Sequence, residues 1–175
     1  MTRIFNDPLL NIARFFIVLV MAIFVVALLA IIIALPAIGM YHSQVIAALA
    51  EDGAPAAALW AIVALMLLAA AVISLCWLFL RHMKRIIDTV AAGDPFVPEN
   101  ANRLRAMGWL VLIIYLIGIP LGAIAMWMAS VTEGADIRFT GDLGGGGIVL
   151  CLTLFILARV FRKGTEMREE LEGTI

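Results

Sequence analysis

The sequence predicts an all-α integral membrane protein: a four-helix transmembrane bundle with both termini in the cytoplasm, whose second and third helices extend into the cytoplasm. Three observations predict this fold class. The chain of 175 residues is 65% hydrophobic and only 14% charged. Its apolar residues form four long uncharged runs, and its basic residues gather in alternate connections between those runs. So little polar surface cannot cover a globule in water, so a bilayer is the expected solvent.

The uncharged runs are Phe15 to Tyr41, Gly53 to Leu80, Ala106 to Thr132 and Leu143 to Ala158. A helix needs roughly 20 apolar residues to cross a bilayer, and the first three runs exceed that length. The fourth ends at Arg159, whose guanidinium can snorkel to the headgroups and extend the span to about Phe161. We therefore predict a single membrane domain, residues 1–175, with transmembrane helices at about 15–40, 57–80, 107–129 and 145–161, a cytoplasmic loop at 81–106 and a cytoplasmic tail at 162–175.

The distribution of basic residues predicts the orientation. Eleven of the 12 lysines and arginines lie before the first span, between the second and third, or at and after the end of the fourth; only Arg138 lies on the other side. Short cytoplasmic loops carry such an excess of positive charge, so both termini are expected in the cytoplasm. The first run is far longer than the core of a cleaved signal peptide, so we interpret it as an anchor.

The sequence argues against an enzyme. The first three spans contain no ionisable residue of the kind that marks ion-coupled transport. His42 and His82 would lie on opposite membrane faces and cannot share a metal, and no phosphate loop, nucleophile elbow or metalloprotease motif is present. We expect no catalytic residue, no metal and no cofactor. The lipid bilayer is the one certain partner, and direct binding of nucleic acid is not expected.

The polar stretch from residue 91 to 105 interrupts this apolar chain. Gly93 is a natural end for a helix that continues past Arg81, and Pro98 suits the first turn of the next helix. Phe96 is then exposed between two prolines, where its ring can pack back on the helix ends, enter the membrane interface or contact another protein; packing is favoured. In the third span, Gly118 and Gly122 are candidates for helix packing, within one chain or in a homodimer.

Two stretches together resemble a known family. They are Gly93-Asp94-Pro95-Phe96, followed by Asn100, Arg103-Leu104-Arg105 and Gly108, and, late in the chain, Leu157-Ala158-Arg159-Val160-Phe161-Arg162 and Gly164. The pattern resembles the bacterial membrane family called domain of unknown function 2975 over nearly the full length. The resemblance implies a regulatory partnership with a small XRE-type helix-turn-helix transcription regulator, and no enzymatic activity.

The first functional hypothesis is a regulatory membrane protein whose cytoplasmic loop and acidic tail bind and sequester such a partner. Its candidate partner-binding residues are Gly93, Pro95, Phe96, Asn100, Arg103, Glu169 and Glu170. The alternative is a small transporter, an immunity protein or a binder of hydrophobic ligands that uses the interior of the helix bundle, where methionines can adapt to apolar compounds.

Overall fold

A computed structural model of the chain describes residues 8–51, 53–132 and 145–172, and all of its regular structure in these ranges is helical. The helices are α1 (Pro8–Met40), α2 (His42–Glu51), α3 (Ala57–Ala91), α4 (Pro98–Val131) and α5 (Gly146–Glu172). Three of them, α1, α3 and α4, are long and apolar enough to cross a membrane. The all-α fold and the membrane-type helices are therefore confirmed, whereas a fourth span is not.

The helix boundaries agree with the predicted extensions. Helix α3 continues ten residues beyond Arg81, and α4 begins at Pro98 and runs into the third apolar run without a break. Helix α5 is also continuous, so the predicted tail is helical as far as Glu172. The predicted outer loop with Arg138 lies outside the described residues. Helix α2 was not predicted; it is a short polar-ended helix that follows the long α1 after a one-residue break.

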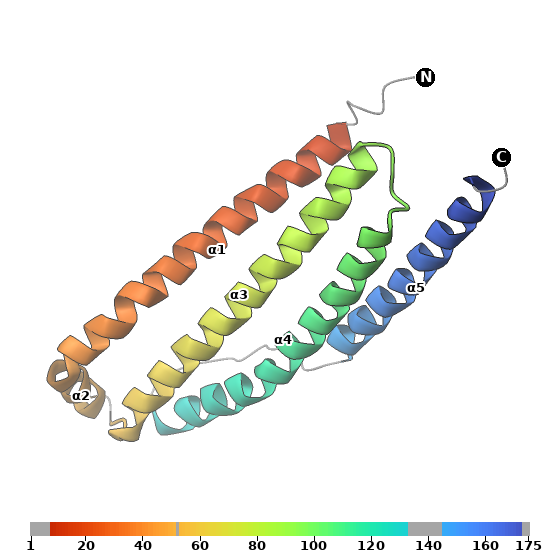
Figure 1. Cartoon of the computed structure of the whole chain (residues 1–175). Helices are drawn as coiled ribbons and strands as arrows, with labels where there is room; N and C mark the ends of the chain where they lie inside the picture. The colour runs from red at the N-terminus through yellow and green to blue at the C-terminus, as the bar shows by residue number, and fades with distance from the viewer. Residues whose placement is uncertain (1–7, 52, 133–144, 173–175) are drawn as a thin grey trace.

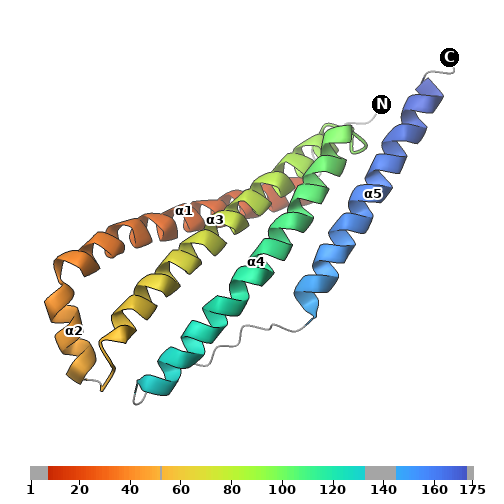
Figure 2. The same cartoon turned by 60° about the horizontal axis from the view of Figure 1, so that its bottom comes forward.

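The long helices lie side by side in the order α1, α3, α4, α5, as both views show (Figures 1 and 2). The main packing follows the same order: α1 contacts α3, α3 contacts α4, and α4 contacts α5 most extensively. Helices α1 and α5 lie at opposite edges of this row, so the predicted four-helix bundle with a common interior is not confirmed. Helices that are apolar on every side do not encode in their sequence which face meets a neighbour.

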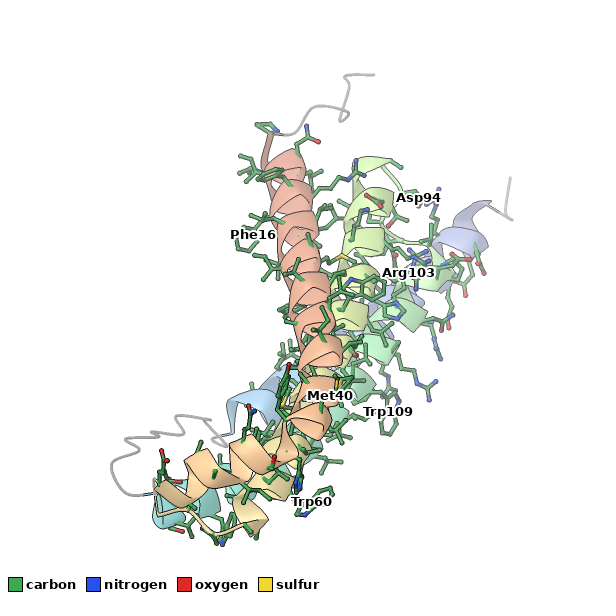
Figure 3. The ribbon with its side chains drawn as sticks, turned by 90° about the vertical axis from the view of Figure 1, so that its left-hand side faces the viewer. Phe16, Met40, Trp60, Asp94, Arg103 and Trp109 are labelled. Atoms are coloured by element: carbon green, nitrogen blue, oxygen red, sulfur yellow. The ribbon has the colours of Figure 1, made fainter. Side chains whose placement is uncertain are left out.

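Two apolar clusters join neighbouring helices, one near each end of the helices. One joins α4 to α5 through Leu104, Met107, Leu154 and Ala158, with Phe79, Met83 and Ile86 of α3 packed against it. The other joins α3 to α4 through Ala58 and Met128, together with Ala54 of the connection between α2 and α3, and Leu49 of α2 packs against it. Outside these clusters the helices expose large apolar side chains, for example Phe15 at 70% and Ile33 at 71%. Phe16 points away from the other helices (Figure 3), as expected for a residue that faces lipid.

Glycines on α4 and α5 receive aromatic rings from the neighbouring element. A Cβ on Gly108 would lie 3.1 Å from the ring of Phe155, and one on Gly147 would lie 3.0 Å from the ring of Tyr115. The thiol of Cys151 donates a buried hydrogen bond to the carbonyl of Gly108, at 3.4 Å. Small residues thus let these two helices approach closely. Of the predicted packing glycines, Gly122 is buried and Gly118 is half-buried, both in α4.

Candidate functional site

The start of α1, the connection between α3 and α4 and the end of α5 lie at the same end of the molecule (Figure 1). We call it the turn end, and we call residues 92–97 the turn. Five of the seven predicted partner-binding residues lie in or beside the turn. This end also carries most of the charged side chains that the structure describes, and Asp94 and Arg103 lie there, far from Trp60 (Figure 3).

Backbone hydrogen bonds shape the first half of the turn. The amide of Asp94 donates to the carbonyl of Thr89 at 3.1 Å, and the amide of Gly93 donates to that of Val90 at 3.0 Å. This is the Schellman pattern, which requires a left-handed residue after the helix. Gly93 supplies it, with a φ of 83°. The predicted role of Gly93 as the end of the helix is confirmed.

Gly93→Ala is expected to lower the free energy of unfolding by about 1–2 kcal/mol, because a left-handed backbone disfavours every residue with a Cβ. Nothing lies within 4 Å of the added Cβ, so the cost is one of backbone conformation alone. Gly39→Ala is the matched control: it also adds a methyl in open space, but inside the helix α1, where alanine is the better residue. Detergent-titrated unfolding followed by circular dichroism measures both; equal midpoints for the two variants would contradict the assignment.

The second half of the turn leads into α4. Val97 has an extended backbone (φ −98°, ψ 143°), as expected for a residue before proline, and Pro98 occupies the first turn of α4, as predicted. Proline has no amide hydrogen to leave unpaired at that position. The two halves together fix the direction in which α4 leaves α3.

Asn100 locks the two helices around the turn. Its side chain is completely buried. Its amide nitrogen donates to the hydroxyl of Thr89 at 2.7 Å and to the carbonyl of Pro95 at 2.9 Å, and its amide oxygen accepts from Arg103 at 2.7 Å. A second contact of the Arg103 guanidinium, 3.4 Å to the carbonyl of Arg85, links it to α3. Asn100 has no surface to present to a partner, so any part it takes in binding is to position the turn.

Phe96 docks on α5. Its ring lies 5.4 Å from that of Phe161, measured between centroids, and over Gly164, where a Cβ would come within 2.8 Å of the ring. The hydroxyl of the buried Thr165 lies 3.4 Å from the carbonyl of Phe96 and 3.0 Å from that of Phe161. The packing that the sequence favoured for Phe96 is confirmed. Even so, 42% of the Phe96 side chain stays exposed.

Two ion pairs flank this contact. Arg168 of α5 pairs with Asp94 of the turn, and Arg14 of α1 pairs with Asp88 of α3. All four side chains are partly exposed, and pairs of this kind contribute little to stability. Their effect is orientational, because they tie the first and the last helix to the connection between α3 and α4.

The two sequence stretches that resemble a family therefore touch each other. The Gly-Asp-Pro-Phe stretch forms the turn, and the stretch from Leu157 to Gly164 forms the surface of α5 on which it docks. The family described as "Protein of unknown function (DUF2975)" matches residues 44–175. The chain belongs to the DUF2975 family. No curated protein and no solved structure is significantly similar to it.

The DUF2975 match covers α3, α4 and α5 and therefore every residue of the turn contact. Sequence reasoning found Gly93, Pro95, Phe96, Asn100 and Arg103, which lie together as described. It missed their partners Thr89, Gly164, Thr165 and Arg168. Gly164 was part of the noted pattern, but nothing in the sequence paired it with Phe96, 68 positions earlier. Glu169 and Glu170 lie on the exposed side of α5, beyond the turn contact.

A groove opens beside the turn contact. It has a volume of about 310 Å³ and is lined by Pro98, Ala101, Asn102, Arg162, Thr165, Glu166 and Glu169. Its walls are the first turns of α4 and the last turns of α5. Within the described residues, no three histidine, cysteine or acidic side chains are grouped closely enough to hold a metal ion.

His82 lies on α3 among the arginines of the turn end. Burial lowers the pKa of His82 below its ordinary value of 6.5, and the positive charges of Arg85, Arg103 and Arg81 lower it further. Its Nδ1 atom is buried and has no hydrogen-bond partner among the described residues. The folded protein therefore favours a neutral imidazole at this position.

This lowered pKa predicts a pH dependence of stability. The unfolded chain binds a proton on His82 more readily than the folded chain does, so the stability that the neutral imidazole contributes is fully present above about pH 6.5 and decreases as the pH falls below it. We expect the denaturant concentration at the unfolding midpoint of the natural chain to decrease when the pH is lowered from about 7.5 to about 5.5. The midpoint of His82→Gln should decrease less. A decline of equal size in both chains would contradict this assignment.

Proposed function

We propose that this DUF2975 protein resides in the bacterial inner membrane, crosses it four times and has both termini in the cytoplasm. Helices α1, α3 and α4 supply three spans. The first part of α5, from Gly146 to about Phe161, supplies the fourth, since it contains no charged residue before Arg159, whose guanidinium can snorkel to the headgroups, and packs along α4. The turn end then faces the cytoplasm, in agreement with its many basic residues.

The function that the site supports best is the binding of a cytoplasmic protein at the turn end, without catalysis. One observation carries this proposal: Phe96 is fixed on α5 by its ring and its carbonyl, yet stays 42% exposed beside the groove of Pro98, Asn102 and Glu169. An aromatic side chain that is held rigid beside a groove loses little conformational entropy when it binds, which favours an anchor for a partner.

The charge of the surface indicates the chemistry of the partner. Glu166, Glu169 and Glu170 are exposed on the last turns of α5, next to this groove. A partner with a basic face would complement them, and a DNA-binding protein has such a face. We therefore propose a helix-turn-helix regulator of the XRE type as the partner, held at the membrane by its DNA-binding side.

The structure changes how this proposal is best tested. Removing the chain after Arg162, or replacing Phe96 with alanine, takes away part of the contact between the turn and α5 and so alters the fold locally. Charge neutralisation on the exposed side of α5 avoids this difficulty. Glu169→Gln/Glu170→Gln keeps Gly164, Thr165 and Arg168 in place, and Glu51→Gln, at the opposite end of the molecule, is the control.

We expect tagged natural chain, extracted from its native cells in mild detergent, to recover a small helix-turn-helix protein. Glu51→Gln should recover as much, and Glu169→Gln/Glu170→Gln should bind it roughly three- to tenfold more weakly, as expected for the loss of two exposed charge contacts. Equal recovery by all three chains would show that the acidic surface of Glu169 and Glu170 does not contribute to binding. Recovery of no such protein by the natural chain would refute the proposal itself.

The alternative use of a bundle interior has less support, because the helices form a row. A strongly apolar groove lies between α4 and α5, and its lining favours a different occupant.

A further inference from the structure

A groove in two adjoining parts runs along the α4–α5 pair. Its apolar part has a volume of about 250 Å³ and is lined by Leu112, Tyr115, Gly147, Ile148, Cys151, Leu152 and Phe155. Its basic part has a volume of about 520 Å³ and is lined by Arg105, Phe155, Ala158, Arg159, Arg162, Lys163 and Glu166. Phe155 lines both parts, so they meet end to end. We call the whole the α4–α5 groove.

Helical spacing explains why one face carries both parts. On α5, Leu152, Phe155, Arg159 and Arg162 follow one another at intervals of three or four residues, the spacing of neighbours on one helix face. On α4, Arg105, Trp109 and Leu112 do the same. Trp109 meets Phe155 edge to face, with ring centroids 5.6 Å apart. The groove therefore changes from apolar to basic near this aromatic pair.

The basic part has an excess of uncompensated positive charge. It contains three arginines and Lys163, against the single carboxylate of Glu166, which lies 3.3 Å from Lys163. No ion pair or hydrogen bond between described residues involves the guanidinium of Arg105, Arg159 or Arg162. By contrast, Arg14 and Arg168 pair with aspartates. Arg105, Arg159 and Arg162 come from two helices and line one groove.

The depth of the groove follows from the proposed topology. Trp109 and the first apolar turns of α4 mark the cytoplasmic interface of the membrane, where tryptophan is enriched. The basic part then lies at the level of the headgroups and the apolar part at that of the acyl chains. Basic pockets between transmembrane helices on the cytoplasmic side suit anionic headgroups, whose phosphates accept hydrogen bonds from guanidinium groups.

We propose that the α4–α5 groove binds an anionic phospholipid, with its phosphate among Arg105, Arg159 and Arg162 and an acyl chain beside Phe155, Leu112 and Leu152. The charge contrast between the two parts matches the two ends of such a lipid. The proposal rests on the proposed membrane topology and is independent of the cytoplasmic partner. A lipid in this position would cover the seam between α4 and α5 and support the helix that carries the turn contact.

Trp109 provides a probe at the aromatic pair. In a chain with Trp60→Phe, Trp77→Phe and Trp127→Phe, the remaining tryptophan fluorescence reports on the groove. This chain would be placed in phosphatidylcholine vesicles that contain one-fifth phosphatidylglycerol, with bromine on the acyl chains of either lipid. We expect bromine on phosphatidylglycerol to quench Trp109 several-fold more, per labelled lipid, than bromine on phosphatidylcholine.

Matched charge variants test the site. Arg159→Gln/Arg162→Gln should lower the preference for phosphatidylglycerol roughly tenfold, because two basic groups beside the phosphate are lost. Arg81→Gln/Lys84→Gln removes the same charge from the basic groove between α1 and α3 and should leave the preference unchanged. The proposal would be overturned if bromine on the two lipids quenched Trp109 equally in the chain without charge substitutions. It would also be overturned if the two pairs of substitutions had equal effects.

Two further arms complete the test. Glycerol 3-phosphate at millimolar concentration should not relieve quenching by brominated phosphatidylglycerol; relief would show that the groove takes a soluble phosphate compound instead. If the chain with three tryptophans replaced fails to fold, the lipids that stay bound to the natural chain after purification are identified by mass spectrometry. The absence of anionic phospholipid among these bound lipids would contradict the proposal. The topology is tested separately by labelling the thiol of a Glu170→Cys variant with a reagent that is added on the cytoplasmic side. Failure of the lipid site and failure of the topology can then be told apart.

Discussion

Asn100→Ala is expected to lower the free energy of unfolding by about 2–4 kcal/mol, among the largest effects for any single side chain at the turn end. The side chain of Asn100 is fully buried, and its amide group makes three hydrogen bonds. Its loss leaves the carbonyl of Pro95 and the guanidinium of Arg103, both in half-buried residues, without these partners. Removing one partner of a buried hydrogen bond costs the desolvation of the other.

The hydroxyl of Thr89 is affected differently. It already donates to the carbonyl of Ile86 at 2.7 Å, so it serves Asn100 as an acceptor only. Without Asn100 it keeps one hydrogen bond and loses the other. Most of the expected cost therefore arises at Pro95 and Arg103.

Asn102→Ala is the matched control, because it removes the same side chain two positions later on α4, where it is exposed and lines a groove. Surface substitutions of this kind usually change stability by less than about 0.5 kcal/mol. Both variants would be unfolded by denaturant titration in mixed micelles and followed by circular dichroism. If Asn100→Ala and Asn102→Ala unfold at the same denaturant concentration, the hydrogen bonds of Asn100 do not hold the turn together.

The sequence predicts this region well because its signals are local. Gly93 and Pro98 act on the backbone within a few residues, and each occupies the position that its chemistry favours. The continuation of α3 past Arg81 follows equally from the spacing of apolar residues within one helix. For the same reason the uncharged runs are enough to indicate three membrane-type helices.

The sequence does not predict the arrangement of the helices. In a soluble protein, the contrast between an apolar and a polar face shows which side of a helix is buried. In membrane-type helices both the lipid-facing and the packed side are apolar, so this contrast is missing. The same apolar runs in the sequence therefore fit both the expected bundle and the observed row. Helix α2 was not predicted because its ten residues lie between the predicted spans at about 15–40 and 57–80, where no element was assigned.

Shape supplies the missing specificity in the α4–α5 contact. Phe155 fits against Gly108, Tyr115 against Gly147, and Phe96 against Gly164. Each pair joins an aromatic ring to a residue without a side chain, and each is distant in sequence. No periodic pattern marks such pairs, because a glycine in a helix has many uses. They become visible only when both helices are placed.

Gly164→Ala gives the sharpest test of the turn contact, because its effect is expected to change sign with the residue at position 96. In the natural chain, the new methyl would come within 2.8 Å of the Phe96 ring. The ring cannot move towards Phe161, which it already contacts, so it moves out into solvent and the turn loses its hold on α5. Overpacking of this kind costs about 1–3 kcal/mol, more than the roughly 1 kcal/mol that alanine gains over glycine inside a helix.

In a chain that already carries Phe96→Ala, the ring is absent. Only the free energy that alanine gains over glycine inside a helix then remains. Gly164→Ala should then stabilise the protein by about 0.5–1 kcal/mol, so the double-mutant cycle should give a coupling free energy of about 1–3 kcal/mol between positions 96 and 164, equal to the cost of overpacking. Unfolding of the four chains under identical conditions measures this coupling. Additive effects would mean that Phe96 does not dock on α5, and the exposed edge of its ring would then have no rigid support from which to anchor a partner.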